Sequence, residues 1–253
     1  MQLSQRARKT LWRFLPVEFI WYFQDILRPK TFGQLGEDAV IYNHLSWLGL
    51  PVGRRGAYLD IGGHHPTRGS NTAKFYRRGS RGFVVDFGRR KALLWKVARR
   101  RDIFINAACV PNSLASDDVA VTMSNHFGGA RDALVNLGEN NPQHRHLVKA
   151  ITAEKLAQFV ITHELWQKAP WKFISIDVEG IDEDILRDLN LHRLKADVIA
   201  IEHFLPSRIS PWMKIPHLLS EPLVAYLAAN GYSLQSICGP TLVFVRIASF
   251  VRL

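Results

Sequence analysis

From residue 33 to the end of the chain, short apolar runs alternate with longer segments whose apolar residues recur at helical spacing. Each short run is rich in strand-forming residues, which predicts strands over 57–61, 82–86, 102–108, 172–177 and 197–202. Helical spacing predicts helices over 37–48, 91–100, 153–165, 183–189 and 222–230, and a further helix that begins with Ser70 as its N-cap. This alternation indicates βα units and a mostly parallel sheet.

The last two predicted strands, 232–237 and 241–247, are separated only by Cys238, Gly239 and Pro240. So short a link makes an antiparallel hairpin. A dinucleotide dehydrogenase ends instead with parallel strands and crossovers. The hairpin resembles the end of class I S-adenosylmethionine-dependent methyltransferases. We therefore expect their Rossmann-like α/β fold, a mostly parallel seven-stranded sheet with an antiparallel C-terminal hairpin strand and helices on both faces.

Two segments depart from this alternation. Residues 1–32 form an arm that is first basic and then aromatic, before a domain at 33–253. Arg13, Glu18 and Asp25 interrupt its apolar run, which is too short and too charged to span a bilayer. Two interpretations stay open for residues 1–30: a helix lying on an anionic membrane, or a helix that caps the core or a dimer interface.

The second departure is residues 111–150, where Asn, Gly, His and Pro are frequent and only 119–123 has the pattern of a strand. Irregular segments of this length inside a compact domain are uncommon, and functional ones often cover a substrate. We therefore expect an insertion that acts as a substrate lid.

Composition and charge narrow the class of protein. A chain of 253 residues with 47% hydrophobic and 22% charged residues is typical of a globular domain, and its net charge of +11 favours an anionic partner. The two cysteines, Cys109 and Cys238, form neither a disulfide framework nor a metal motif, and no secretory signal pattern precedes them. We expect a cytoplasmic protein, which is membrane-peripheral if the arm binds lipid.

Candidate chemistry begins where two strands end. The first predicted strand closes on Asp60, Gly62 and Gly63, and the second closes on Asp86. Ligands of open α/β sheets bind at the carboxyl ends of strands, where glycines let the backbone approach and an acid accepts hydrogen bonds from a ribose. The pair of strand ends indicates a nucleotide-like cofactor, whereas the first turn taken alone also fits an ordinary tight βα turn.

Several motifs resemble the FkbM-type methyltransferase family and occur in that family's order. They lie within 33–247, at 34–38, 59–66, 70–72, 75–76, 79, 82–86, 101–103, 106–108, 173–180, 201–203 and 230–232. Asp177-Val178-Glu179-Gly180 is the most specific of them, together with the Gly63-His64-His65-Pro66 turn.

This resemblance implies an S-adenosylmethionine-dependent O-methyltransferase that acts on a hydroxyl of a sugar, glycan or secondary metabolite and releases S-adenosylhomocysteine. Asp60 is then expected to bind the amino group of the cofactor and Asp86 its ribose. Phe87 is expected to pack against the adenine, which Asn106 and Ala107 border. The remaining residues expected at the cofactor are Gln34, Gly62, Gly63, His64, Ser70, Asn71 and Asp177.

Methyl transfer to a hydroxyl needs in-line geometry and a group that takes the proton. His65 and His203 are the candidates for the base, and Glu179 completes the predicted catalytic set. Asp177, Glu179 and His203 also have the chemistry to bind a divalent cation, which we do not favour. The arginine-rich stretch 89–101 predicts either a solvated helix face or a surface for phosphates or anionic lipid.

Two other functions compete with this interpretation. The net charge of +11 suggests an RNA methyltransferase, but no RNA-binding module is appended, so a nucleic-acid partner is not expected. A catalytically silent protein that keeps the cofactor is the third possibility. The pattern leaves the acceptor and the oligomeric state open.

Overall fold

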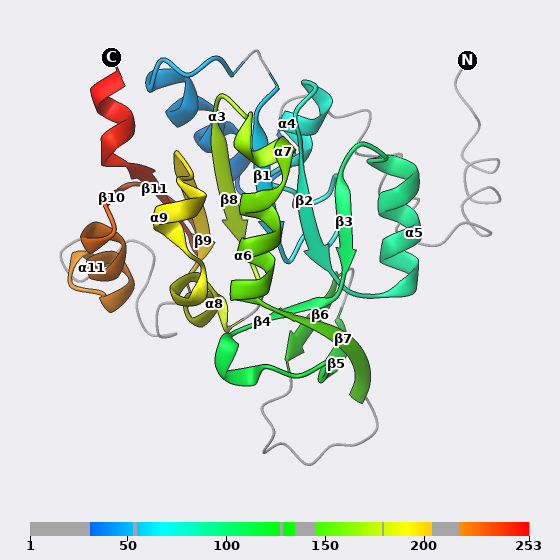
Figure 1. Cartoon of the computed structure of the whole chain (residues 1–253). Coiled ribbons are helices and arrows are strands. Elements are labelled where there is room, and N and C mark those ends of the chain that lie inside the picture. The colour runs from blue at the N-terminus through cyan, green and yellow to red at the C-terminus, as the bar shows by residue number, and fades with distance from the viewer. Residues whose placement is uncertain are drawn as a thin grey trace, which may run out of the picture.

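The computed structural model describes residues 31–52, 55–126, 129–134, 145–178, 180–203 and 218–252. At its centre is a seven-stranded sheet in the order β10-β11-β9-β8-β1-β2-β3 (Figure 1). Five neighbouring strands are parallel: β1 (Ala57–Ile61), β2 (Arg81–Asp86), β3 (Ile103–Asn106), β8 (Lys172–Ile176) and β9 (Val198–Glu202). The sheet confirms the predicted fold.

The C-terminal hairpin completes this sheet. Its two strands are β10 (Tyr232–Cys238) and β11 (Thr241–Arg246), and β11 lies antiparallel between β9 and β10. The strand order with one reversed strand is that of class I methyltransferases and confirms the expectation drawn from the short link at 238–240.

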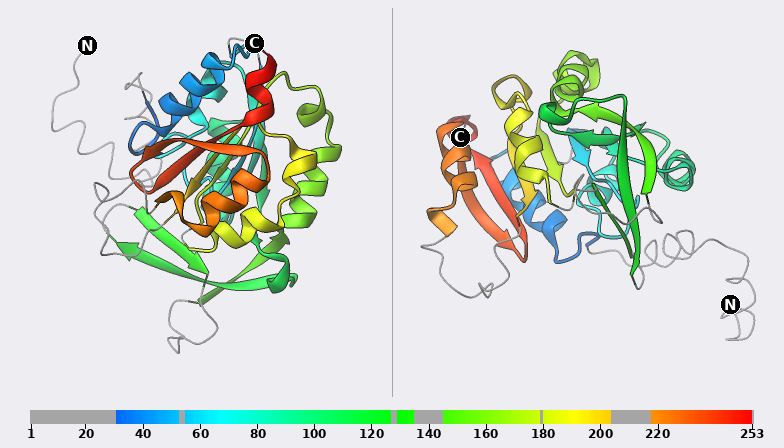
Figure 2. Two further views of the ribbon diagram at one scale, coloured as in Figure 1. Left: turned by 90° about the vertical axis from the view of Figure 1, so that its left-hand side faces the viewer. Right: turned by 90° about the horizontal axis from the view of Figure 1, so that it is seen from below.

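Helices cover both faces of the sheet (Figure 2). One face carries α3 (Glu37–Trp47), α4 (Ala73–Arg77) and α5 (Arg89–Ala98). The other carries α6 (Ala153–Thr162), α7 (Glu164–Gln167), α8 (Asp182–Asp188), α9 (Leu191–Leu194) and α11 (Pro222–Ala229). Successive side chains of β1 point to opposite faces of the sheet, so the core has two halves. Tyr58 packs against the first group of helices and Leu59 against the second.

The predicted helix 153–165 is wrong in one respect. The backbone of His163 is extended and separates α6 from α7, and its Nδ1 accepts a hydrogen bond from Leu165 N at 3.0 Å. The apolar spacing continues through this break because both short helices face the same core. Periodicity alone therefore does not reveal the break between α6 and α7.

The insertion is more regular than its composition predicts. A second sheet of order β4-β7-β5-β6 comprises β4 (Ala108–Val110), β5 (Asp118–His126), β6 (Gly129–Leu134) and β7 (Arg145–Thr152). The 3-10 turns η1 (Asn112–Leu114) and η3 (Ile247–Arg252) complete the described elements. The expectation of a mostly irregular segment is wrong because cross-strand pairing, such as His126 with Gly129, stabilises strands whose own residues favour loops.

The second sheet lies beyond the carboxyl ends of β2, β3 and β8 (Figure 1). Among the described residues, no helix is both long enough and apolar enough to cross a membrane. The arm at 1–30 lies outside the described residues, and so does Glu179.

Candidate active site

The carboxyl ends of four parallel strands lie side by side in register. Ile61 of β1 pairs with Val85 of β2 on one side and with Ile176 of β8 on the other, and Ile176 pairs with Ile201 of β9. The next residue along each of the first three strands is Gly62 after Ile61, Asp86 after Val85 and Asp177 after Ile176. These three residues therefore lie next to one another at the same edge of the sheet. The strand ends that the sequence singled out meet at one edge of the sheet.

Packing of the protein itself explains the two glycines after β1. The amides of Gly62 and Gly63 donate to Val85 O, at 2.9 and 3.3 Å. A β-carbon on Gly62, whose φ is +85°, would collide with the carbonyl oxygen of Asp177, and one on Gly63 would stand only 2.4 Å from Val84 Cγ1 of β2. Glycine is required at both positions because the protein itself, the backbone after β8 and a β2 side chain, packs against this turn.

Asp60 is directed into the protein. Its side chain accepts a hydrogen bond from the Thr72 hydroxyl at 2.5 Å, and the residue is only 5% exposed. Burial raises the pKa of Asp60 to about 6, although the Thr72 hydrogen bond and the nearby Arg99 charge both oppose this shift. The carboxylate thus stabilises the turn that follows β1.

Arg99 is the centre of this buried network, and the sequence analysis missed it. Its Nε donates to Asp102 Oδ2 at 2.7 Å, and its Nη2 donates to the hydroxyl of Tyr58 at 2.7 Å. Its Nη1 donates to Thr72 Oγ1 at 2.9 Å and to the carbonyl oxygen of Pro66 at 3.3 Å. Arg99 is 3% exposed, so the prediction of a solvated or phosphate-binding arginine is wrong at this position.

Hydrogen bonds to neighbouring elements hold the rest of the turn. Ser70 Oγ accepts from Ala73 N at 3.1 Å, but α4 begins at Ala73 with Thr72 as its N-cap, so the prediction of Ser70 as the N-cap is wrong by two residues. Asn71 Nδ2 donates to Ser175 Oγ of β8 at 3.1 Å. Gln34 lies against Gly69, since its Cγ is 3.3 Å from the place where a β-carbon on that glycine would stand.

The two histidines of the turn are constrained in different ways, His65 by hydrogen bonds of its side chain and His64 by its backbone conformation. His65 is 2% exposed, and its Nδ1 accepts from Thr67 N at 3.1 Å and from Arg68 N at 2.9 Å. That nitrogen is therefore occupied by the turn. His64 has a φ of +41°, in the left-handed region that residues other than glycine seldom adopt.

Asp86 is held at the end of β2 by groups of its own turn. Oδ1 accepts from Phe87 N at 2.6 Å, and Lys91 Nζ lies 3.0 Å from Oδ1 and 3.1 Å from Oδ2. Asn106, beside it on β3, accepts from Gly88 N at 2.9 Å. The carbonyl oxygen of Asp86 also accepts from Ala107 N at 3.1 Å, which places the expected adenine-side residues around one strand end.

Phe87 is half-buried and packs against the small cluster formed by Ala108 and Val110 of β4. The ammonium of Lys91 lies 5.3 Å from the centre of the Phe87 ring. The aromatic residue therefore connects the end of β2 with the second sheet.

Asp182 anchors the loop after β8. Its Oδ1 accepts from Val178 N at 2.8 Å and its Oδ2 from Gly180 N at 2.9 Å. Burial raises the pKa of Asp182, while these backbone hydrogen bonds lower it. Asp177 N donates to Ile61 O at 2.9 Å, which fastens this loop to the turn after β1. The sequence analysis did not find Asp182.

His203 follows β9 and is held by the C-terminal hairpin, because its amide donates to Pro240 O at 2.9 Å. Its Nε2 is 3.7 Å from Glu221 Oε2, and its side chain is 15% exposed. This nitrogen is buried and has no hydrogen-bond partner among the described residues. The charge of His203 also acts on Asp182, so the imidazole lies near the loop after β8.

Comparison with known proteins assigns the chain to a family. The family model of the methyltransferase FkbM domain matches residues 60–234. The chain belongs to the FkbM methyltransferase family. As a member of this family, it is a methyltransferase that uses S-adenosylmethionine.

One solved structure that the FkbM chain resembles is Burkholderia thailandensis 1,6-didemethyltoxoflavin-N1-methyltransferase, with bound 1,6-didemethyltoxoflavin and S-adenosylhomocysteine. The identity is 14% and the TM-score 0.36, and the alignment covers 97% of this chain and 90% of that chain. No curated protein sequence matches the chain significantly.

The residues at the carboxyl edge of the FkbM domain fit the cofactor by their chemistry. A carboxylate held at the end of β2 is an acceptor for ribose hydroxyls, and the half-buried ring of Phe87 beside it suits a purine. Asp86 and Phe87 would hold the nucleoside part, with Asn106 at its border.

The metal alternative has less to support it. Within the described ranges, no group of three His, Cys, Asp or Glu residues is arranged to hold a metal ion. The cation set considered from the sequence includes Glu179, which is not among those residues.

Proposed function

We propose that the protein methylates a hydroxyl group of a sugar, glycan or secondary metabolite, and that His203 Nε2 accepts the hydroxyl proton. The position of His203 carries this proposal. Its Nε2 is a buried nitrogen without a hydrogen-bond partner among the described residues, and it follows the strand beside β8. A buried polar atom that lacks a partner is costly, and such atoms concentrate where a ligand completes the bonding.

Glu221 supports the same role. Its carboxylate lies 3.7 Å from His203 Nε2, close enough to pair with the imidazole once the proton has arrived. Pro240 O fixes the backbone of His203 through the hydrogen bond at 2.9 Å. The imidazole is thus positioned by the hairpin, and its product state is stabilised by a neighbouring charge.

In this reaction the cofactor supplies the methyl group and the protein removes the hydroxyl proton. When bound, S-adenosylmethionine supplies a methyl group on a positively charged sulfur. The hydroxyl proton would pass to His203 Nε2 as the acceptor oxygen takes the methyl group, and S-adenosylhomocysteine would be the other product. Because a free alcohol is about as weakly acidic as water, a base at the acceptor oxygen accelerates the step.

Substitution of the base tests this role. We expect His203→Gln to lower kcat about 10²- to 10⁴-fold, the contribution typical of general base catalysis. The acceptor KM and the Kd for S-adenosylhomocysteine should stay within about twofold, because proton transfer adds nothing to binding of the ground state. His192→Gln, at an exposed histidine of α9, is the matched control. An unchanged kcat in His203→Gln would exclude His203 as the base.

The class of acceptor needs a separate experiment. S-adenosylmethionine with a labelled methyl group should be offered to a panel of glycans, small hydroxylated metabolites and RNA under the same conditions. We expect label in a hydroxylated saccharide or metabolite. Selective labelling of RNA would overturn the proposed acceptor class, and the absence of any cofactor binding would overturn both enzymatic functions.

We further propose that the second sheet covers the acceptor. β4 begins at Ala108, two residues after Asn106, and the sheet lies beyond the carboxyl ends of β2 and β3 (Figure 1). Replacement of the hairpin at 119–134 by a short Gly-Ser linker should raise the acceptor KM and leave the Kd for S-adenosylhomocysteine within about twofold. An unchanged KM would count against the lid.

A further inference from the structure

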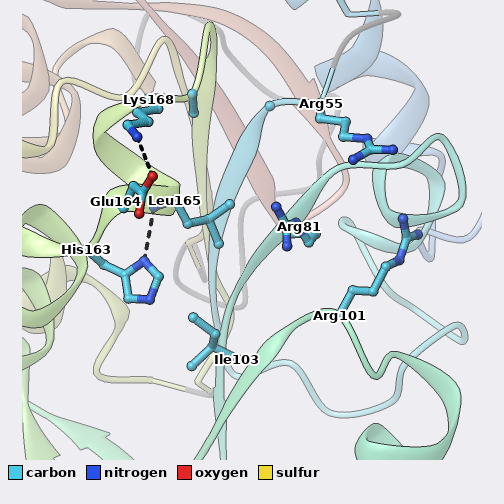
Figure 3. Close-up of a pocket in the computed structure, with 10 residues that line it drawn as sticks. Arg55, Arg81, Arg101, Ile103, His163, Glu164, Leu165 and Lys168 are labelled. Carbon is cyan, nitrogen blue, oxygen red and sulfur yellow. Dashed lines mark hydrogen bonds and ion pairs between the residues drawn. The ribbon is translucent and has the colours of Figure 1, made fainter.

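A cavity of about 430 Å³ lies at the amino ends of β1, β2 and β3, the opposite edge of the sheet from the turns of the active site. Its lining includes Gly56, directly before β1, and the first residues of the next two strands, Arg81 and Ile103. The opposite wall is the junction of α6 and α7, from His163 to Ala169 (Figure 3). The methyl-transfer site does not account for this cavity.

Three arginines dominate its charge. Arg55, Arg81 and Arg101 are all exposed, and none of them forms an ion pair with a carboxylate of the described residues. Figure 3 shows the side chains of Arg55, Arg81 and Arg101 on one side of the cavity, across from Glu164 and Lys168. Glu164 is the acidic residue of the lining, and it is paired with Lys168.

Part of this cationic wall is fixed in place. Arg101 Nη2 donates to the carbonyl oxygen of Tyr76 at 2.9 Å, and the guanidinium lies 4.5 Å from the centre of the Tyr76 ring. The side chain of Arg55 passes beside Gly79, where its Cγ is 3.7 Å from the position that a β-carbon would occupy. A guanidinium already held by the protein loses less conformational entropy when it binds a ligand.

We propose that this cavity binds a phosphorylated group, either a free diphosphate or the headgroup of an anionic phospholipid. Guanidinium groups match the geometry of phosphate oxygens through paired hydrogen bonds, and three arginines without a carboxylate partner among the described residues give the cavity a net positive charge that attracts an anion. Ile103 and Leu165 give the lining an apolar portion beside the charges. The site is separate from the methyl-transfer site, so the proposal does not depend on the identity of the acceptor.

Titration with inorganic diphosphate tests the shared chemistry. Calorimetry at constant ionic strength should compare the full-length chain with the triple variant Arg55→Gln, Arg81→Gln, Arg101→Gln. The control is Lys96→Gln, Lys155→Gln, Lys195→Gln, which removes the same charge from three exposed lysines that do not line the cavity. We expect the arginine variant to weaken diphosphate binding by at least about tenfold and the lysine variant by less than about twofold. Equal losses in both variants, or no binding by the wild-type chain, would show that the cavity does not bind free diphosphate.

Vesicle flotation distinguishes the lipid source. Vesicles of phosphatidylcholine with and without phosphatidylglycerol should be mixed with the same three proteins. Loss of flotation only in the arginine variant, and only with phosphatidylglycerol, supports a headgroup site. If neither diphosphate nor anionic vesicles respond selectively to the arginine variant, the proposal fails. Selective loss of RNA binding in that variant, with no diphosphate or vesicle effect, would also overturn it.

Two further measurements separate loss of the site from loss of the fold. The Kd for S-adenosylhomocysteine should stay within about twofold in the arginine variant, because the cofactor residues lie at the other edge of the sheet. The single variant Arg81→Gln changes one exposed residue at the start of β2 and should still weaken diphosphate binding about threefold or more. A fully folded Arg81→Gln with unchanged diphosphate and vesicle binding would contradict the site.

Discussion

The turns after β1 and β2 look alike in the sequence, since each follows an apolar strand with an acid at its end, but the two acids have different partners. Asp60 is the fourth residue of β1, and its carboxylate is bonded to Thr72 close to Arg99. Asp86 is the last residue of β2, and its carboxylate is bonded to Phe87 N and Lys91. The position of the acid relative to the strand end accounts for the difference.

This comparison separates two functions of a strand-end carboxylate. Asp60 lies one residue before the end of β1, so its side chain is directed onto the sheet face that carries α4 and α5, where it stabilises the turn. Asp86 lies at the edge itself and shares that edge with Asn106. The offset from the strand end therefore sets the partners of the carboxylate: Thr72 for Asp60, and Phe87 N with Lys91 for Asp86.

The largest expected effect is on stability. Arg99→Met should lower the free energy of unfolding by about 3–5 kcal/mol, because it leaves the buried Asp102 without its partner at 2.7 Å. Lys91→Met removes the corresponding cation of the second turn, which is more exposed, and should cost about 1 kcal/mol or less. Urea unfolding of the two variants measures the difference. Equal losses would mean that the two turns are stabilised alike.

Asp60 should make the stability of the protein depend on pH. The pKa of Asp60 is raised by burial from 3.8 to about 6 in the folded protein. A carboxyl group with a raised pKa binds its proton more tightly when folded, so its contribution to stability falls as pH rises from its unfolded pKa through its folded pKa.

Asp60→Asn should remove that contribution. Relative to wild type, the variant should gain on the order of 3 kcal/mol in unfolding free energy between about pH 3.5 and pH 7, at 1.36 kcal/mol for each pKa unit. Asp86→Asn serves as the comparison. Parallel stability curves for Asp60→Asn and wild type across this interval would show that burial does not raise the pKa of Asp60.

The sheet was predictable because its signals are local. Each parallel strand is an apolar run closed by a turn residue, and the short link at 238–240 specified the reversed strand. Apart from 119–123, the strands of the second sheet were missed because β5 pairs with β7, which is distant in sequence, although β5 and β6 form a local hairpin that closes at His126 and Gly129. Composition alone favoured loops there.

For the site, the sequence located the edge but not the contacts within it. Asp86 and Asn106 share a strand edge, as their spacing predicted. Arg99 stood among six other basic residues of 89–101, and nothing local distinguished the buried one from its exposed neighbours. Its partners Tyr58 and Thr72 come from elements far away in the chain, so only the folded structure brings them together.

Binding of the cofactor product should depend mainly on the second turn. We expect Asp86→Ala to weaken binding of S-adenosylhomocysteine about tenfold, or about 1.4 kcal/mol, if the carboxylate at the strand edge accepts hydrogen bonds from the ribose, as we propose. Asp60→Asn keeps the size of its side chain and should change the same Kd by less than about threefold. Calorimetry measures both values. A larger effect of Asp60→Asn would reverse the roles assigned to the two acids.

The smallest difference concerns the polar side chains that fasten the two turns. Ser70→Ala removes the bond to Ala73 N at 3.1 Å and a contact with Arg99 Nη1 at 3.3 Å, and should cost about 1 kcal/mol, as for a helix N-cap. Asn106→Ala removes the bond to Gly88 N at 2.9 Å, where water can replace the lost partner, and should cost about 0.5 kcal/mol. Thermal unfolding of the two variants under one buffer resolves this order. If Asn106→Ala proved the more destabilising, the second turn would depend on its own hydrogen bonds as strongly as the first, and Asp86 would be a structural residue like Asp60.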